Sequence, residues 1–379
     1  MTSKEANDYI KKNLKLSNGK LSIKTGLTVA AVEHRIRRLG LRRSSKEYST
    51  VEEDVINLDE SNKERSLKEK YKILLKKISE VEVERDAIKQ AKSLIQTHEI
   101  VKSKSSENEA VAVILASDFH VEERVRKETV NDRNEYNLSI ASKRSDEFFI
   151  NAVKLIKKEQ QDVNINKVVL ALLGDFISGN IHQELLANCS LPPIKAMIYA
   201  QNLIVSGILY ILKNTDVDLI IPCHVGNHPR ITQKVHISNE QGNSLEYYMY
   251  HVLADYFKDE KRITWIIAEG YHTYVKVFDW MIRFHHGHNI KYGQGIGGLF
   301  IPTYKAISQW NKVCWADYDC FGHLHTQRDG GNFISNGSLI GYNAFAVSIK
   351  GDYEPPRQQF FLIDSKRGKT VTTPILFSI

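Results

Sequence analysis

The most constraining feature of the chain is a series of short apolar runs, each followed by a polar cluster. Val111–Ala116, Lys167–Leu173 and Val217–Cys223 have the length and composition of buried strands. The helical stretches Asn137–Lys157 and Pro193–Lys213 separate them. Because strands that alternate with helices form parallel sheets, this region predicts an α/β domain.

The last third of the chain has a different pattern, in which strands follow one another directly. Tyr274–Phe278 and Met281–His286 flank one turn, and Phe360–Asp364 and Lys369–Ile375 flank another. Such pairs predict antiparallel strands added to the sheet. We therefore expect one α/β domain over residues 106–379, with helices outside the sheet.

The apolar runs end in polar clusters in the order SDFH, GDF, GNH, HHGH and GHLH. Loops at the carboxyl ends of strands are where α/β folds assemble their sites, so we expect these clusters to converge. They contain ten side chains that could bind metal: Asp118, His120, Asp175, Asn227, His228, His285, His286, His288, His323 and His325. Their mixed nitrogen and oxygen atoms suit Mn²⁺, Fe or Zn²⁺.

Each cluster taken alone also has an ordinary explanation. Asp118 and His120 would point the same way from an extended segment, but such pairs are common. Asp175 could cap a helix, and Asn227 could lie in a turn. The histidines around Gly287 are harder to explain by packing, because a buried imidazole needs partners for both ring nitrogens. The combination of all five clusters in one order therefore carries the interpretation.

The ordered set DxH, GD, GNH, HG and GHxH resembles the calcineurin-like metallophosphoesterase superfamily over Asp118–His325. This resemblance implies a four-layer αββα sandwich and two divalent metal ions, of which Mn²⁺ is expected first. It assigns one ion to Asp118, His120, Asp175 and His325. It assigns the other to Asp175, Asn227, His286 and His323, so that Asp175 would bridge the two.

The resemblance also implies a reaction. A hydroxide between the two metals would attack phosphorus, and His228 would assist the leaving oxygen. His286 is assigned as the ligand because the family ligand directly precedes the glycine. His285 and His288 remain alternatives.

Some features depart from the family pattern. Pro229 and Arg230 follow GNH, where many members carry an acidic residue. Arg230 could bind a phosphate oxygen or lie on the surface. The segments Val121–Glu135 and Ser178–Leu191 are longer than compact members need and could shape substrate access. Within the second segment, His182 is a weak candidate for substrate contact, with a capping role as the alternative.

Positive charge is concentrated at one end of the chain. Residues 1–50 contain 12 Lys and Arg against 4 Asp and Glu, whereas the other 329 residues contain 40 against 41. A basic excess confined to one end predicts a module that binds a polyanion such as nucleic acid. A solvated basic tail is the alternative.

The basic end has the pattern of a helix-turn-helix domain over residues 1–45. Ser3–Leu14 predicts a first helix, and Gly26 and Thr28 predict a tight turn and a helix cap within Leu21–Arg43. One apolar face would consist of Ile23, Leu27, Val32, Ile36 and Leu39. The residues expected to contact DNA are His34, Arg35, Arg37, Arg38, Arg42 and Arg43. The same small fold also serves protein contacts.

Residues 46–105 connect the two predicted domains. After a polar linker, apolar residues recur at steps of four and three over residues 67–95, which predicts a coiled coil and a homodimer. Arg85 and Lys92 interrupt the seam, so a helix that packs as an intramolecular spacer is the alternative.

Three functions remain open from the sequence. The basic module favours a DNA phosphodiesterase, that is, a nuclease. The second is a phosphoprotein phosphatase or small-molecule or nucleotide phosphodiesterase with a DNA-anchoring domain. The third is an inactive DNA-binding regulator, which the full set of expected ligands argues against. The absence of a long uninterrupted apolar run predicts a soluble, cytoplasmic protein without a membrane partner.

Overall fold

The computed structural model describes residues 1–42, 76, 79, 82, 99–100, 108–181, 187–291 and 297–377. They belong to two compact units, Met1–Gln90 and Ala91–Ile379. The predicted boundaries near residues 45 and 105 stay predictions, because the chain around them lies outside the described residues. The predicted dimer seam over residues 67–95 also lies outside them; Lys76, Ser79 and Glu82 are described as exposed helical positions but do not belong to the seam.

Three short helices lie within residues 1–42 of the smaller unit: α1 (Ser3–Lys12), α2 (Asn18–Thr25) and α3 (Val29–Arg38). Each contributes one fully buried side chain to a common core, namely Ile10, Leu21 and Val32. Helices this short are marginal in water, so the shared core is what stabilises them. The predicted first helix is present but ends at Lys12.

The turn between α2 and α3 has the predicted chemistry. Gly26 ends α2 with a left-handed φ of 71°. The Thr28 hydroxyl caps α3 by accepting from Ala31 N at 3.2 Å. The predicted apolar face is wrong at Ile23, which is 72% exposed. Leu21 takes the inward position, and residues two apart on a helix do not share a face.

The first sheet of the larger unit has the strand order β12-β11-β2-β3-β4-β5. β2, β3 and β4 pair in parallel, as predicted, β5 extends this parallel set without having been predicted, and β11 and β12 form an antiparallel hairpin beside β2. The strands are β2 (Ala110–Ala116), β3 (Lys167–Leu172), β4 (Asp218–Cys223), β5 (Ile263–Ile267), β11 (Arg357–Asp364) and β12 (Gly368–Leu376).

The second sheet has the order β1-β6-β7-β8-β10-β9. β6 and β7 form the predicted antiparallel hairpin, but in this second sheet and not in the sheet of β2, β3 and β4, while β7, β8 and β10 run parallel. The strands are β1 (Glu99–Ile100), β6 (Thr273–Val277), β7 (Trp280–Phe284), β8 (Tyr318–Phe321), β9 (Arg328–Asp329) and β10 (Phe333–Ser335).

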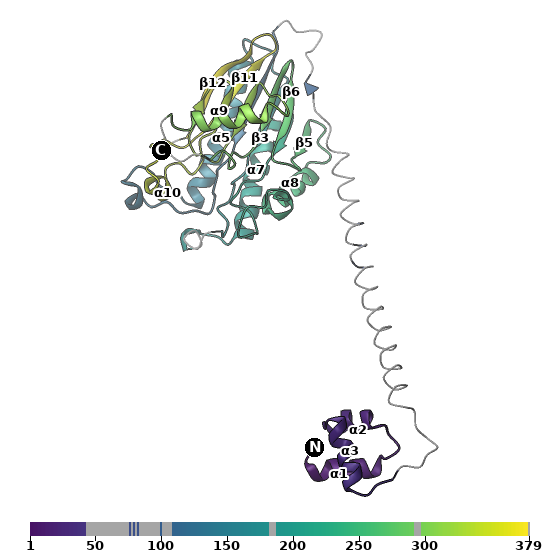
Figure 1. Ribbon diagram of the computed structural model, residues 1–379. Coiled ribbons are helices and arrows are strands. Elements are labelled where there is room, and N and C mark those ends of the chain that lie inside the picture. Colours follow the sequence, from purple (N-terminus) through teal and green to yellow (C-terminus); the bar gives the residue numbers. More distant parts are fainter. Residues whose placement is uncertain are drawn as a thin grey trace. The chain divides into compact units, whose positions relative to one another are not determined.

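Alternate strand residues separate two cores. Ile114 and Leu170 face the helices on the first sheet, whereas Val113 and Val169 face the second sheet. The helices are α5 (Leu138–Glu159), α7 (Pro193–Asn214), α8 (Leu245–Tyr256) and α9 (Phe300–Trp310). α5, α7 and α8 pack on the first sheet and α9 covers the second through Ile307 (Figure 1). The expected four layers, αββα, are therefore present.

One described helix, α7, is long and apolar enough to cross a membrane by length and composition, with a mean hydropathy of 1.4. The sequence predicted a helix over Pro193–Lys213, but no apolar stretch long enough to cross a membrane. Ala200, Ile204 and Ile208 of α7 are fully buried in the core of the larger unit, and core helices commonly pass the same test. The cytoplasmic location and the absence of a membrane partner stay predictions.

Candidate metal centre

The five polar clusters meet where the strands of both sheets end, following β2, β3 and β4 of the first sheet and β7 and β8 of the second. Asp118 N donates to Gly174 O at 2.9 Å, and Gly322 N donates to His286 O at 2.8 Å. His323 N donates to Asp118 Oδ2 at 3.0 Å and so joins the loops of the two sheets. The predicted convergence is confirmed.

Three overlapping groups of side chains have the spacing of metal ligands. In each group, one ligand atom per residue lies within 4.8 Å of the others. The groups are Asp118, His120 and His325; His120, Asp175 and His228; and Asp175, His286 and His323. Asn227 joins the third group, because its Oδ1 lies 3.1 Å from His286 Nε2. The structure thus brings all seven predicted ligands together, with Asp175 shared between groups.

The distances between ligand atoms fit shared cations. His120 Nε2 and His325 Nε2 are 3.2 Å apart, and His325 Nε2 lies 3.3 Å from Asp118 Oδ1. His286 Nε2 lies 3.0 Å from Asp175 Oδ2. Bonds of about 2.0 to 2.2 Å in tetrahedral geometry separate ligand atoms by roughly 3.3 to 3.6 Å. The residues therefore fit divalent metal ions in chemistry and spacing.

The backbone at these residues is unusual. Five of the seven predicted ligands have a left-handed conformation: Asp118 (φ 56°), His120 (φ 47°), Asp175 (φ 56°), His323 (φ 66°) and His325 (φ 50°). The prediction that Asp118 and His120 project from an extended segment is therefore wrong. Tight turns bring the two side chains to the same group instead. Such conformations cost free energy and concentrate at functional sites, where the surrounding structure enforces them.

Glycines allow the loops to approach closely. A Cβ on Gly174 would lie 2.3 Å from Gly226 N, which confirms that the glycine before Asp175 leaves room for its neighbour. A Cβ on Gly226 would lie 2.0 Å from Asp175 Oδ1, and one on Gly322 would lie 2.5 Å from Asp118 Oδ2. Larger residues at these positions would displace the carboxylates.

Sequence reasoning missed Glu246, which lies in the first turn of α8 and is fully buried. Its two carboxylate oxygens accept from Phe176 N and from Gly226 N, each at 2.7 Å. It therefore joins the loop of Asp175 to the loop of Asn227. Burial, followed by the nearby Asp175, raises the pKa of Glu246 to about 8, against the two N–H donors. An acidic residue in a first helical turn is so common that it gives no functional signal.

The pKa values of the site residues are shifted by burial and by neighbouring charged groups. Burial lowers the pKa of His120 and of His323 well below the ordinary value for histidine. Burial opposes the charged form of His286 too, but Asp175 raises the pKa of His286 to about 10. Burial would raise the pKa of Asp175, yet His286 and His228 bring it well below its usual value. A carboxylate surrounded by imidazoles suits cation binding.

His285 and His288, the alternatives to His286, make different contacts. His286 Nδ1 donates to Leu173 O at 2.6 Å, which directs Nε2 toward the ligand groups. His285 is fully buried, stacks on Phe321, and has no hydrogen-bond partner among the described residues. His288 Nε2 lies 3.1 Å from Glu240 Oε1. Only His286 of the three belongs to a ligand group.

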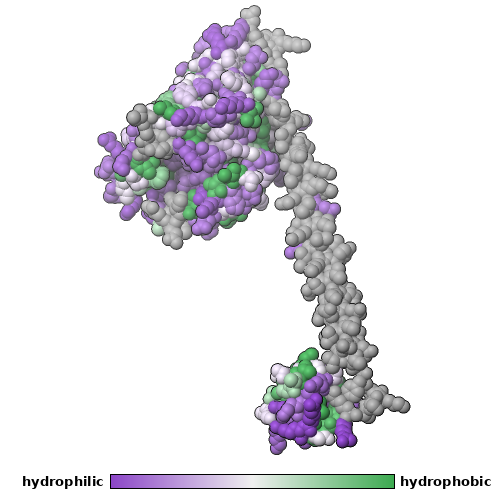
Figure 2. All heavy atoms as spheres, in the orientation of Figure 1, coloured by the Kyte–Doolittle hydropathy of each residue, from purple (hydrophilic) through white to green (hydrophobic). Residues whose placement is uncertain are grey.

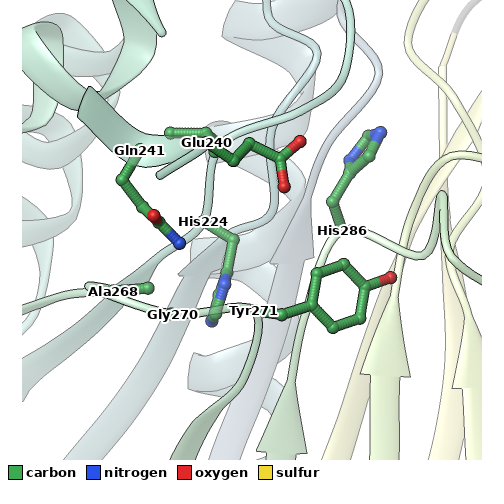
Figure 3. A pocket seen from close by; sticks show the side chains of 8 residues that line it. His224, Glu240, Gln241, Ala268, Gly270, Tyr271 and His286 are labelled. Carbon is green, nitrogen blue, oxygen red and sulfur yellow. The ribbon is translucent and has the colours of Figure 1, made fainter. Parts of the chain in front are cut away.

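A small cavity lies beside His286 (Figure 3). Its volume of about 10 Å³ is room for one water molecule. It is lined by His224, Val225, Glu240, Gln241, Ala268, Gly270, Tyr271 and His286. Unpaired buried atoms there, such as His224 Nε2, fit a bridging water. The cavity is too small for a phosphate ester.

The two weaker substrate candidates gain no support. The guanidinium of Arg230 donates to Asn227 O, to Thr232 O at 3.2 Å and to Gln233 O at 3.3 Å. It thus holds the loop that carries Asn227, and its binding to phosphate stays a prediction. His182 lies outside the described residues.

The predicted DNA-contacting residues differ in their surroundings. His34, Arg37, Arg38 and Arg42 are exposed, and Figure 2 shows hydrophilic side chains over much of the visible face of the smaller unit. Arg35 instead donates to Ser3 O and Asn7 Oδ1, each at 3.1 Å, and so holds α3 against α1. Arg43 lies outside the described residues.

Comparison with known proteins assigns no role to the site. Neither models of known protein families nor curated proteins match the sequence. Among solved structures, hypothetical protein PH1004 from Pyrococcus horikoshii is 11% identical, with a TM-score of 0.36, over 71% of this chain and 89% of that chain. Vps29 from Chaetomium thermophilum is 10% identical, with a TM-score of 0.29, over 70% and 96%. A dimetal phosphatase from Danio rerio is 9% identical, with a TM-score of 0.32, over 71% and 99%. Scores this low assign no function.

Proposed function

We propose that the larger unit is a metal-dependent phosphoesterase that uses two divalent ions, and that its substrate is the DNA backbone. The observation that supports the first part is the meeting of the seven predicted ligands from five loops, with Asp175 shared between groups. Bound metals of this kind polarise a phosphate ester and activate water for attack on phosphorus. Mn²⁺ is the ion that we would test first.

The residues of the chain have distinct roles in this proposal. Asp118, His120, Asp175 and His325 would hold one ion. Asp175, Asn227, His286 and His323 would hold the other. His228 N donates to Asp175 Oδ1 at 2.8 Å, and its ring stands edge-on to that of His120 with 4.9 Å between centroids. The half-buried imidazole of His228 thus lies with His120 and Asp175 in the second of the three groups, where it would donate a proton to the leaving oxygen.

The smaller unit supports the choice of DNA. Its α3 exposes His34, Arg37 and Arg38, whose side chains could contact phosphates and bases in a major groove. A basic module on the same chain would deliver the phosphoesterase to a polyanion. A phosphatase or a phosphodiesterase for small molecules, with the smaller unit as an anchor, is the competing outcome of the test.

The experiment measures Mn²⁺-dependent hydrolysis of p-nitrophenyl phosphate, bis-p-nitrophenyl phosphate, and labelled single- and double-stranded DNA. Asp175→Asn should lose activity on every substrate that the wild type cleaves, whereas Asp279→Asn, in an exposed turn, should not. Arg37→Ser with Arg38→Ser should weaken DNA cleavage but leave hydrolysis of the small esters unchanged. Cleavage of small esters alone would overturn the nuclease, and no hydrolysis with Mn²⁺, Fe²⁺ or Zn²⁺ would overturn the phosphoesterase.

A further inference from the structure

Four buried polar side chains form a hydrogen-bonded chain that ends at a predicted ligand. Asn343 Nδ2 donates to Glu123 Oε1 at 3.0 Å, and Ser178 Oγ donates to Glu123 Oε2 at 3.0 Å. Ser178 Oγ lies 2.9 Å from His120 Nδ1. None of the four is more than 8% exposed. Glu123, Ser178 and Asn343 lie outside the motifs that predicted the metal centre.

The first member of the chain determines which atoms donate. Asn343 caps the short helix α10 (Ala344–Ser348), and its Oδ1 accepts from Ala346 N at 3.0 Å. Because a backbone N–H can only donate, the amide oxygen of Asn343 faces Ala346 and the amide nitrogen faces Glu123. Glu123 accepts at both oxygens, so the hydroxyl of Ser178 donates its hydrogen bond to Glu123.

This order leaves one arrangement at His120. A serine hydroxyl has a single proton, so Ser178 Oγ can only accept from His120 Nδ1–H. A neutral imidazole with its proton on Nδ1 keeps a lone pair on Nε2. That atom lies 3.2 Å from His325 Nε2, within the first ligand group. The chain therefore prepares His120 to bind a cation.

We propose that Glu123 is a positioning residue that fixes the Nδ1–H tautomer of His120 through Ser178, with Asn343 setting the direction of the hydrogen bonds. The proposal rests on the proposed function, in which His120 Nε2 is a metal ligand. It also assigns a role to Val121–Glu135, the segment that carries Glu123.

Glu122 provides a matched control. Its Oε1 accepts from Ser178 N at 2.8 Å and from Gly179 N at 2.9 Å, while its Oε2 has no hydrogen-bond partner among the described residues. In Glu122→Gln the amide oxygen can keep both bonds. This variant therefore removes a buried carboxylate beside the site but leaves the chain from Asn343 to His120 unchanged.

Glu123→Gln should reverse the chain. The amide oxygen of glutamine would accept from Asn343, so its nitrogen would donate to Ser178. Ser178 would then donate to His120 Nδ1, and the imidazole proton would move to Nε2, where it competes with a metal. In the metal-free full chain, ¹⁵N NMR of the imidazole should show this change of tautomer. Calorimetric titration with Mn²⁺ should show an affinity about 10- to 100-fold lower, as is typical when a partner of a ligand is lost.

A second substitution should restore the direction. In the double variant with Glu123→Gln and Asn343→Asp, the new carboxylate would accept from the glutamine nitrogen, and the glutamine oxygen could again accept from Ser178. An aspartate also caps helices well, so α10 should persist. We expect the Nδ1–H tautomer to return and Mn²⁺ affinity to recover. A purely structural role for Glu123 would not be rescued in this way.

The outcomes separate this inference from the proposed function. An Nδ1–H tautomer that persists in Glu123→Gln, or a double variant that binds Mn²⁺ no better than the single one, would overturn the role of Glu123. Loss of affinity in Glu122→Gln as large as in Glu123→Gln would overturn it too. If Glu123→Gln switches the tautomer of His120 but the wild-type protein hydrolyses no phosphate ester, the positioning role is supported and the proposed enzyme activity is overturned.

Discussion

Replacing Glu246 by glutamine should loosen two ligand loops at once. In the wild type, the carboxylate accepts from Phe176 N and Gly226 N, each at 2.7 Å. These donors adjoin Asp175 and Asn227 in the sequence. Glutamine has the same shape but only one acceptor oxygen, so its NH₂ group must face one of the two N–H donors.

The magnitude follows from the number of bonds lost. One buried N–H group would remain unpaired, which costs about 1 to 3 kcal/mol of the free energy of unfolding. Loss of the buried negative charge offsets part of this cost, because burial already raises the pKa of Glu246 to about 8. A second effect should fall on the site. Loss of an outer partner typically lowers metal affinity about 10- to 100-fold.

The assay compares Mn²⁺ affinity by calorimetry with the urea midpoint of the metal-free chain. Glu269→Gln is a suitable control. Glu269 accepts at 2.7 Å from the hydroxyl of Tyr247, which lies on α8 next to Glu246, but Glu269 itself is exposed. We expect Glu246→Gln to bind Mn²⁺ about 10- to 100-fold more weakly and to lose at most about 3 kcal/mol of stability, and Glu269→Gln to change neither. Wild-type Mn²⁺ affinity in Glu246→Gln would refute the idea that this side chain holds the ligand loops.

Three further variants test other parts of the structure. Gly226→Ala would place a Cβ 2.0 Å from Asp175 Oδ1, so metal-dependent hydrolysis should fall about 100-fold, the typical cost of a displacement near 1 Å; near-normal rates would contradict the close packing. Asp319→Asn leaves the fully buried guanidinium of Arg283 without the carboxylate that accepts from it at 2.6 and 2.9 Å, so urea denaturation should show a loss of about 3 to 5 kcal/mol. A loss under about 1 kcal/mol would mean that the pair is not needed. Burial, followed by the nearby His285 and Arg283, lowers the pKa of His272 from 6.5 to about 3. Between those values only the unfolded chain binds the proton, so stability falls as pH decreases, by at most about 1.4 kcal/mol per pH unit and by less for a partly exposed ring. His272→Gln should flatten the decrease in thermal midpoint between pH 6.5 and 5, and an unchanged slope would rule out this source.

Local sequence patterns determined the elements and the identity of the candidate ligands. Val111–Ala116, Lys167–Leu173 and Val217–Cys223 are strands within one residue of their predicted bounds. Gly26 and Thr28 form the predicted turn and cap. These features could be predicted because apolar periodicity, glycine conformation and capping act over a few residues.

The geometry of the site required the tertiary structure. Asp118 and His120 reach a common group through left-handed turns, although a two-residue spacing alone predicted an extended segment. The family resemblance favoured His286 over its neighbours, but only contacts such as the 3.0 Å between its Nε2 and Asp175 Oδ2 place it in the site. Loops of two different sheets make these contacts, so no local pattern determines them.

The outer partners of the ligands were also invisible in the sequence. Glu246 reads as an ordinary helix start, and Glu123 lies 220 residues from Asn343, to which it is hydrogen-bonded. A carboxylate can hold two loops together, or orient a histidine, only when burial removes water and the fold supplies its hydrogen-bond partners. Residue types and their order along the chain therefore determined the candidate ligands and the class of reaction they suit. Long-range packing determined which of their atoms face one another.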